Sequence, residues 1–317
     1  MTKTFGILGH GSIGKRHAQN LVRLGHKVLT FDPSNPIPKS APPFIAMHDE
    51  QDLINNADAI LICSPTALHY EHLVKGLFAR KPIFVEKPIG DTEKCHFLGS
   101  VMGRDPFMVG YNLRFHSCVK KAKEWLDNGI LGQIQWASFV VGQKNDKLDY
   151  LRDGVILNWS HEIDLALYLL GPAKVLQASA RVTGSGEDIA DIWLQHDSGA
   201  RSSIHLDYVT KPEIREAWIV GANNRIGMDL VGRNASLGEY VHRGDDSFDQ
   251  NYVEEIRAFI DRIDGKETIG CNAKEGLAAL EICLQARRLA GLSSETFAHS
   301  IPWTPPSEST PTPKSNS

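Results

Sequence analysis

The fold is decided by a stretch near the start of the chain, Phe5-Gly6-Ile7-Leu8-Gly9-His10-Gly11-Ser12-Ile13-Gly14. Its first half is a short apolar run typical of a buried strand, and residues 13–24 carry the pattern of a helix. The first spaced glycine permits a tight turn, the second lets a phosphate approach the backbone, and the third lets helix and strand pack closely. Free N–H groups at a helix start attract anions. The stretch therefore predicts a dinucleotide-binding turn.

An acidic residue follows at the distance that such a site needs. Residues 26–32 form the next predicted strand, which ends at Asp32, 23 residues after Gly9. A carboxylate there accepts hydrogen bonds from the ribose hydroxyls and repels a 2′-phosphate. The predicted cofactor is therefore NAD. NADP is the less favoured alternative, because Lys39 in the following loop could reach back, and a plain strand-end aspartate is the simplest interpretation of Asp32.

Strands and helices continue to alternate through the first hundred residues. We predict strands at residues 59–63, 82–85 and 107–110 and a helix at 68–78. Continuous apolar strands separated by helices indicate a Rossmann-type, doubly wound parallel sheet, covered on both faces. Residues 33–43 contain five prolines, which predict a loop along the sheet edge. The first domain is predicted to span residues 1–113.

The pattern changes after residue 113, and we predict a C-terminal α+β domain over residues 114–300. Helices are expected at 119–126, 158–170, 252–263 and 273–290. Residues 200–209 alternate between apolar and polar side chains, as expected for a largely antiparallel, open sheet with one apolar face. An uncovered sheet face predicts a homodimer or homotetramer. Residues 301–317 contain five prolines and few apolar groups, so we expect a disordered tail.

Composition excludes several classes of protein. A net charge of −4 offers no basic surface for nucleic acid, and no apolar run approaches the roughly 20 residues that span a membrane. The N-terminus shows no signal peptide. The cysteines lack the spacing of metal ligands or a disulfide framework, so we expect reduced thiols, a cytoplasmic protein and no metal; they are Cys63, Cys95, Cys118, Cys271 and Cys283.

A second motif, Glu86-Lys87-Pro88, follows a predicted strand. Ligands in open α/β sheets bind beyond the carboxyl ends of the strands. A lysine there can hydrogen-bond a substrate oxygen and stabilise a developing alkoxide, or relay a proton. Taken alone, a Lys-Pro pair is more often part of a surface loop.

Several motifs together resemble the glucose–fructose oxidoreductase, inositol dehydrogenase and rhizopine-catabolism family (Gfo/Idh/MocA). The resemblance spans nearly the whole chain short of the tail, and it recurs in the strand, turn and strand of residues 215–229. Besides the glycine turn and Val85-Glu86-Lys87-Pro88, it is carried by Ser64-Pro65-Thr66-Ala67-Leu68-His69, Asn112-Leu113-Arg114-Phe115 and His161-Glu162-Ile163-Asp164.

The resemblance implies roles for individual residues. Lys87 is expected beside the nicotinamide as a catalytic group, with Pro88 fixing its turn through a cis bond, and His161 as the general acid or base at the reacting hydroxyl. The expected cofactor-cleft residues besides the glycine turn are His10, Asp32, Ser64, Pro65, His69 and Glu86, and the expected substrate-facing residues are Lys87, Asn112, Arg114, Asn158, His161 and Asp164.

Simpler interpretations stand beside these roles. His161 can be a structural histidine, Asp164 a helix-surface carboxylate and Arg114 half of an interdomain salt bridge. His10 can be an exposed loop residue, and His17 on the first helix is more often structural.

The chain also departs from the family pattern. Asn158 stands where many members carry an aspartate, and an amide cannot accept a proton. The glycine-rich approach to the His161 helix is reduced to Gly154, and the segment between Arg114 and His161 is shorter.

The resemblance therefore implies an NAD-dependent oxidoreductase that transfers hydride to or from a hydroxyl or carbonyl of a sugar, sugar derivative or cyclitol. A cofactor-binding sensor or regulatory protein on the same fold is the alternative that the departures favour. Reduction of an imine or an unsaturated bond is a third possibility.

Overall fold

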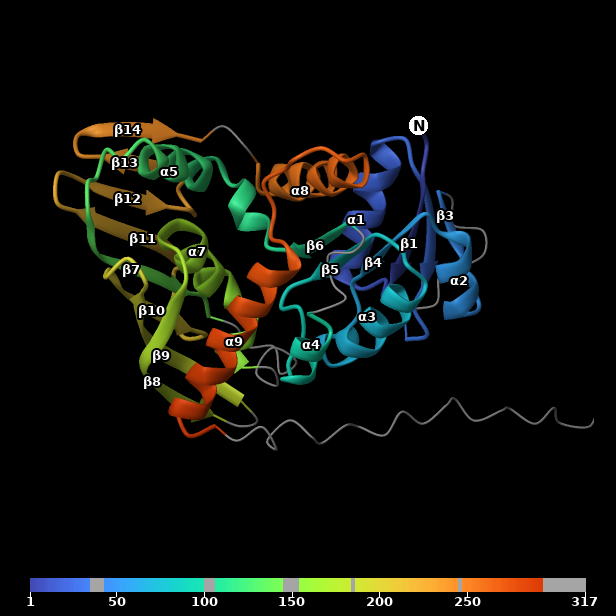
Figure 1. The fold of residues 1–317 in the computed structure, drawn as a ribbon, viewed down its shortest axis with the longest axis horizontal. Helices are drawn as coiled ribbons and strands as arrows, with labels where there is room; N and C mark the ends of the chain where they lie inside the picture. The colour runs from blue at the N-terminus through green and yellow to red at the C-terminus, as the bar shows by residue number, and fades with distance from the viewer. Residues whose placement is uncertain (35–42, 100–105, 145–153, 184–185, 245–246, 293–317) are drawn as a thin grey trace, which may run out of the picture.

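The structure, a computed structural model, describes residues 1–34, 43–99, 106–144, 154–183, 186–244 and 247–292. The protein contains two β-sheets, one on each side of the molecule in Figure 1. Helices pack between and around the two sheets. The predicted proline loop falls largely outside the described residues, and the predicted tail falls wholly outside them.

The N-terminal sheet is parallel and has six strands in the order β3-β2-β1-β4-β5-β6. The central strands are continuous apolar runs with almost every residue buried, as expected for a sheet covered on both faces. The doubly wound prediction is confirmed. The strands are β1 (Thr4–Leu8), β2 (Lys27–Phe31), β3 (Phe44–Ala46), β4 (Ala59–Ile62), β5 (Ile83–Glu86) and β6 (Phe107–Gly110).

Two of the helices that connect these strands were predicted from the sequence, and other elements of this half were not. α1 and α3 match the predicted helices, whereas β3 and α2 follow the proline loop where we predicted no element. Asp49 caps α2 by accepting a hydrogen bond from the Asp52 N–H. The helices and 3₁₀ turns are α1 (Ser12–Arg23), α2 (Glu50–Asn56), η1 (Thr66–Leu68), α3 (His69–Phe78), α4 (Lys94–Phe97) and η2 (Asn112–Phe115).

The second sheet has eight strands in the order β14-β13-β12-β11-β7-β10-β9-β8. Only β7 and β10 pair in parallel, so the predicted largely antiparallel sheet is confirmed. Its strands are β7 (Ile134–Gly142), β8 (Ala173–Thr183), β9 (Gly186–His196), β10 (Arg201–Asp207), β11 (Ile214–Gly221), β12 (Arg225–Asp229), β13 (Asn234–Leu237) and β14 (Tyr240–Arg243).

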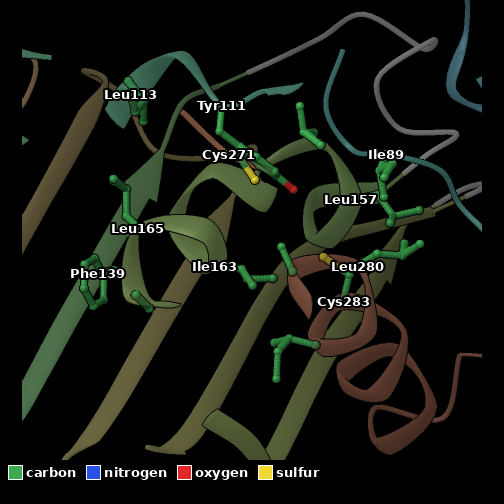
Figure 2. Packing of buried hydrophobic residues seen from close by; sticks show 14 of the residues in the cluster. Ile89, Tyr111, Leu113, Phe139, Leu157, Ile163, Leu165, Cys271, Leu280 and Cys283 are labelled. Carbon is green, nitrogen blue, oxygen red and sulfur yellow. The ribbon is translucent and has the colours of Figure 1, made fainter. Parts of the chain in front are cut away.

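One face of this sheet is covered by helices α5 (Ser117–Asp127), α7 (Ser160–Leu170) and α9 (Ala273–Leu289). Figure 2 shows the apolar packing, with Phe139 of the sheet on one side of α7 and Leu280 and Cys283 of α9 on the other. The opposite face carries half-exposed tryptophans, Trp136, Trp193 and Trp218, at 48%, 41% and 40% exposure.

Helix α8 (Phe248–Ile263) returns to the N-terminal sheet, although it lies far along the chain (Figure 1). Ile256 and Phe259 share a core cluster with Phe5 and Phe84, and the Phe84 and Phe259 rings lie 5.7 Å apart. The boundary at residue 113 stays a prediction. Helix α8 falls within the predicted second domain, yet it packs against the N-terminal sheet and α1.

All five cysteines are buried, and none of them forms a disulfide. Among the described residues, no helix has the length and apolar character needed to cross a bilayer.

Candidate functional site

The glycine turn joins β1 to α1 at the carboxyl edge of the parallel sheet. Gly9 has a φ of +95°, and a Cβ on it would lie 2.6 Å from the Cys63 carbonyl oxygen. A Cβ on Gly14 would lie 2.1 Å from the Gly9 carbonyl oxygen, so α1 can pack this closely only with glycine there. Gly11 has nothing within 4 Å of its Cβ position, and α1 begins with no side-chain cap. The turn is thus open toward Gly11, Ser12 and Ile13 and fits a pyrophosphate.

Asp32 lies beside this turn at the end of β2. Its carboxylate accepts hydrogen bonds from the His10 N–H at 2.7 Å and the Ser34 N–H at 2.9 Å. The His10 side chain is buried against Phe44, with the rings 5.5 Å apart. Our interpretation of His10 as an exposed loop residue is therefore wrong, because β3, which the sequence did not predict, covers its ring.

Glu86 and Lys87 stand at the end of β5, and the Lys87–Pro88 peptide is cis. Glu86 accepts at 2.7 Å in a hydrogen bond with His17 Nε2 and at 3.2 Å from the Lys87 N–H. Glu255 on α8 completes a buried cluster with His17 and Glu86. Burial, together with the Glu86 charge, raises the pKa of Glu255 well above its usual range, which favours a neutral acid there.

His69 connects the cofactor side of the cleft to the Lys87 turn. Its two ring nitrogens lie 2.8 Å from the Pro88 carbonyl oxygen and 2.9 Å from the Ser64 carbonyl oxygen. Burial lowers the pKa of His69 to about 4, so the ring is neutral at physiological pH. The Ser64 hydroxyl pairs with His72 Nδ1 at 2.8 Å, and Pro65 caps the 3₁₀ turn between them. These hydrogen bonds link the segments that follow β4 and β5.

The side chain of Lys87 crosses from the first sheet toward α7. Its Nζ donates a 2.7 Å hydrogen bond to the Asn158 backbone carbonyl, three residues before His161. Because the acceptor is a backbone oxygen, this contact does not depend on the amide that replaces the family aspartate. Upstream, Gly154 has a φ of +72°, and a Cβ there would overlap the Glu187 carboxylate.

His161 is partly buried at the start of α7, and its ring packs edge-on against Tyr111 with the centroids 5.7 Å apart. Its Nδ1 is buried with no hydrogen-bond partner among the described residues. Burial, with the positive charges of Lys87 and Arg215, lowers the pKa of His161 well below its usual range. The neutral imidazole is the form that can accept a proton.

Arg114 of η2 and Asp164 of α7 bind each other. Arg114 Nε and Nη2 donate to the two Asp164 oxygens at 2.9 and 2.6 Å, and its Nη1 donates to Glu275 on α9 at 3.0 Å. Arg114 is 2% exposed and Asp164 1%. This geometry favours a buried salt bridge over the substrate contacts that we predicted for Arg114 and Asp164, and all three partners lie within the predicted second domain. Asn112 is also buried, and its Nδ2 has no partner among the described residues.

A cavity of about 440 Å³ adjoins the first residues of α7. Two of its lining residues, Glu213 and Arg215, come from the start of β11, and the sequence did not identify either as a site residue. Local sequence could not identify them, because the lining comes from distant segments: η2, the residue before α7, the start of β11 and the residues that follow β12. The lining residues are Leu113, His116, Gln143, Trp159, Glu213, Arg215, Leu230, Val231, Arg233 and Ser247.

Comparison with known protein families identifies relatives of both halves of the chain. Residues 3–98 match the family model described as "Oxidoreductase family, NAD-binding Rossmann fold". Residues 119–227 match the "GFO/IDH/MocA C-terminal domain". The two matches follow each other along the chain in the order of the two sheets.

Curated relatives cover almost the whole chain. An inositol 2-dehydrogenase of Rhizobium meliloti is 26% identical, with 91% of this chain and 97% of that protein covered. A myo-inositol 2-dehydrogenase of Thermotoga maritima is 25% identical, with 89% and 95% covered.

Among solved structures, levoglucosan dehydrogenase in complex with NADH superposes with a TM-score of 0.83 at 16% identity, covering 92% of this chain and 97% of that one. UDP-N-acetylglucosamine 3-dehydrogenase from Acidithiobacillus ferrooxidans gives a TM-score of 0.79 at 19% identity, covering 92% and 99%. At these identities the likeness shows the fold.

Proposed function

Because the chain belongs to the GFO/IDH/MocA family of NAD-binding oxidoreductases, we propose that its substrate is a sugar, sugar derivative or cyclitol. The reaction moves hydride between NAD and a hydroxyl or carbonyl carbon of that substrate. The 2.7 Å contact between Lys87 Nζ and Asn158 carries the proposal, because it brings an ammonium group from one domain to the helix start that holds His161. The inositol dehydrogenases among the relatives support the substrate class.

The chain's own residues supply orientation and proton handling, and NAD, when bound, supplies the hydride chemistry. In oxidation, neutral His161 accepts the hydroxyl proton as the C–H bond breaks. The Lys87 ammonium stabilises the negative charge that develops on the oxygen. In reduction, His161 returns the proton. Asp32, Gly11 and the first turn of α1 would hold the ribose and pyrophosphate, for which the open turn leaves room.

Turnover tests this proposal against the sensor alternative. The purified chain is expected to reduce NAD⁺ in the presence of at least one member of a panel of cyclitols, aldoses, uronic acids and nucleotide sugars, followed by reduced-nicotinamide absorbance. Product analysis separates alcohol oxidation from imine or alkene reduction. Tight NAD binding with no turnover on the whole panel would instead support the sensor.

The lowered pKa of His161 predicts the pH dependence of oxidation. The neutral base is lost only as pH falls through its folded pKa, which lies well below 6.5. kcat/KM is therefore expected to show no loss from His161 between pH 8 and about 6.5. In Asn158→Asp, a carboxylate one helical turn away favours the imidazolium, so the acid limb of the kcat/KM profile moves up by about one pH unit.

Asn158→Ser is the control, because it preserves the backbone carbonyl that binds Lys87 and adds no charge. The same acid limb in Asn158→Asp and Asn158→Ser would contradict the assignment of His161 as the base.

We also propose a homodimer or homotetramer that buries the outer face of the second sheet. Trp136, Trp193 and Trp218 stand on one face of the sheet and are 40–48% exposed.

Trp193→Glu is expected to shift the sedimentation coefficient toward the monomer, because a charge in an apolar interface is costly. Phe78→Glu on α3, an exposed apolar residue elsewhere, is the control. A monomeric wild-type protein would refute this proposal.

A cytoplasmic location is part of the same proposal. Five buried cysteines that form no disulfide suit a reducing compartment.

A further inference from the structure

Arg215 stands at the start of β11 with its guanidinium fixed in place. Nε donates to Glu162 Oε1 at 2.7 Å and Nη2 donates to Glu162 Oε2 at 3.1 Å. The guanidinium also lies over the Trp159 ring, 5.2 Å from its centroid. Glu162 is almost fully buried and Arg215 is 12% exposed. A bidentate pair with an aromatic face beneath it leaves the guanidinium little freedom to move.

This pairing does not use all the donors of the side chain. A guanidinium has five N–H groups, and Glu162 occupies Nε and one N–H of Nη2. Across the described part of the chain, no group accepts a hydrogen bond from Arg215 Nη1. Arg215 lines the cavity of about 440 Å³ beside α7. Because Glu162 and Trp159 hold this side chain and it keeps spare donors, it can offer N–H groups to a ligand in that cavity.

The position of Arg215 relative to His161 is fixed by the chain itself. Glu162, which anchors the guanidinium, is the next residue after His161, and Trp159 lies two residues before it. Arg215 is also near enough for its charge to lower the pKa of His161. The spare donors are therefore tied to the helix turn that carries the proposed base.

The electrostatics of the cavity favour hydrogen bonding to an oxygen. Glu162 balances the Arg215 charge, and the acidic lining residue, Glu213, accepts a hydrogen bond from Gln143 at 2.9 Å. Leu113, Leu230 and Val231 give the cavity apolar walls, and a second cation, Arg233, also lines it. A neutral hydroxyl and a carboxylate both present the acceptor that Nη1 needs.

We propose that Arg215 is a substrate-binding residue that holds a second oxygen of the substrate, away from the reacting carbon. This proposal rests on the proposed function. This contact selects polyhydroxy or acidic sugars that carry an acceptor oxygen at that separation. It would orient the reacting hydroxyl toward His161 and Lys87.

Arg215→Lys tests the assignment, because lysine keeps a charge for Glu162 and loses the second arm of the fork. Loss of a hydrogen bond to a charged donor predicts that the KM for the sugar rises about tenfold or more. The KM for NAD⁺ is expected to stay within about twofold, and the thermal midpoint should remain near that of the wild type. Arg225→Lys is the matched control, since Arg225 also stacks on a tryptophan, Trp218, but on the other face of the sheet.

Calorimetry with two different sugars provides a second measurement of the role of Arg215. myo-Inositol and D-glucuronate are titrated calorimetrically into the NAD⁺-loaded wild-type and Arg215→Lys proteins. A weakening confined to glucuronate identifies a carboxylate contact, and an equal weakening identifies a hydroxyl; either supports the proposal.

Unchanged affinity and KM in Arg215→Lys would overturn the assignment, as would wild-type protein that binds neither probe. Binding without hydride transfer would refute the proposed function alone, because the calorimetric comparison still reports on Arg215. If Arg215→Lys unfolds, Glu162→Gln replaces it. This variant keeps the arginine and loosens its anchor, so an unchanged sugar affinity there would equally overturn the proposal.

Discussion

Replacing Lys87 with alanine is expected to lower kcat by about a hundredfold or more, the usual scale for removing a group that handles a proton or a developing charge. Lys87 stands at the end of β5, and its Nζ donates a 2.7 Å hydrogen bond to the Asn158 carbonyl, close to α7. Affinity for NAD⁺, measured by fluorescence titration, should change by no more than a few fold. The pyrophosphate and ribose contacts belong to the glycine turn and Asp32, which this variant leaves intact.

Lys27→Ala provides the matched control for this variant. Lys27 is exposed and begins β2, at the opposite edge of the sheet from the carboxyl ends of the strands. The Lys27→Ala variant loses the same charge and the same methylene groups as Lys87→Ala, but it does not alter the cleft. Equal rates for the wild type, Lys87→Ala and Lys27→Ala would exclude Lys87 from the chemistry.

Replacing Gly14 with alanine is expected to destabilise the protein even without cofactor, by about 3 kcal/mol in the free energy of unfolding, the upper part of the range for overpacking. The new methyl group would lie 2.1 Å from the Gly9 carbonyl oxygen and 3.1 Å from its carbon. Backbone cannot rotate away as a flexible side chain can, so α1 must move from the turn. The measurement is chemical denaturation of the protein without added NAD⁺.

Gly11→Ala separates packing from cofactor binding. Its Cβ would meet nothing within 4 Å, and the backbone of Gly11, with φ −69°, accepts any residue. We therefore expect near wild-type stability without cofactor but weaker NAD⁺ binding, because the methyl group would occupy the approach of the pyrophosphate. Equal denaturation midpoints for Gly14→Ala and Gly11→Ala would contradict the packing argument.

The sequence predicted the first sheet well because its signals are local. An apolar run such as residues 59–62 and a glycine turn each carry enough information within a few residues. β3 and α2 were missed because they are short and follow a proline-rich stretch. A three-residue edge strand is stabilised mainly by its pairing with β2, and no periodicity is measurable over such a length.

The candidate site was predictable only in part, for a related reason. Lys87 and His161 lie in recognisable motifs, whereas the partners that orient the site come from distant segments. Arg215 meets Glu162 across 53 positions, and Arg114 meets Glu275 across 161. Neither pairing leaves a pattern in the local sequence. Arg114 and Asp164 are polar residues in motifs that resemble a substrate site, and only their mutual geometry reveals an ion pair.

The return of α8 to the first sheet has a consequence for how the protein is made. Phe259 contributes to a core shared with Phe5 and Phe84, so the cofactor-binding half acquires part of its core only from residues near position 260. During synthesis, the strands of that half leave the ribosome well before this helix does. Until α8 is synthesised, the apolar side chains that it covers in the folded protein lack that cover, and exposed apolar surface of this kind promotes aggregation.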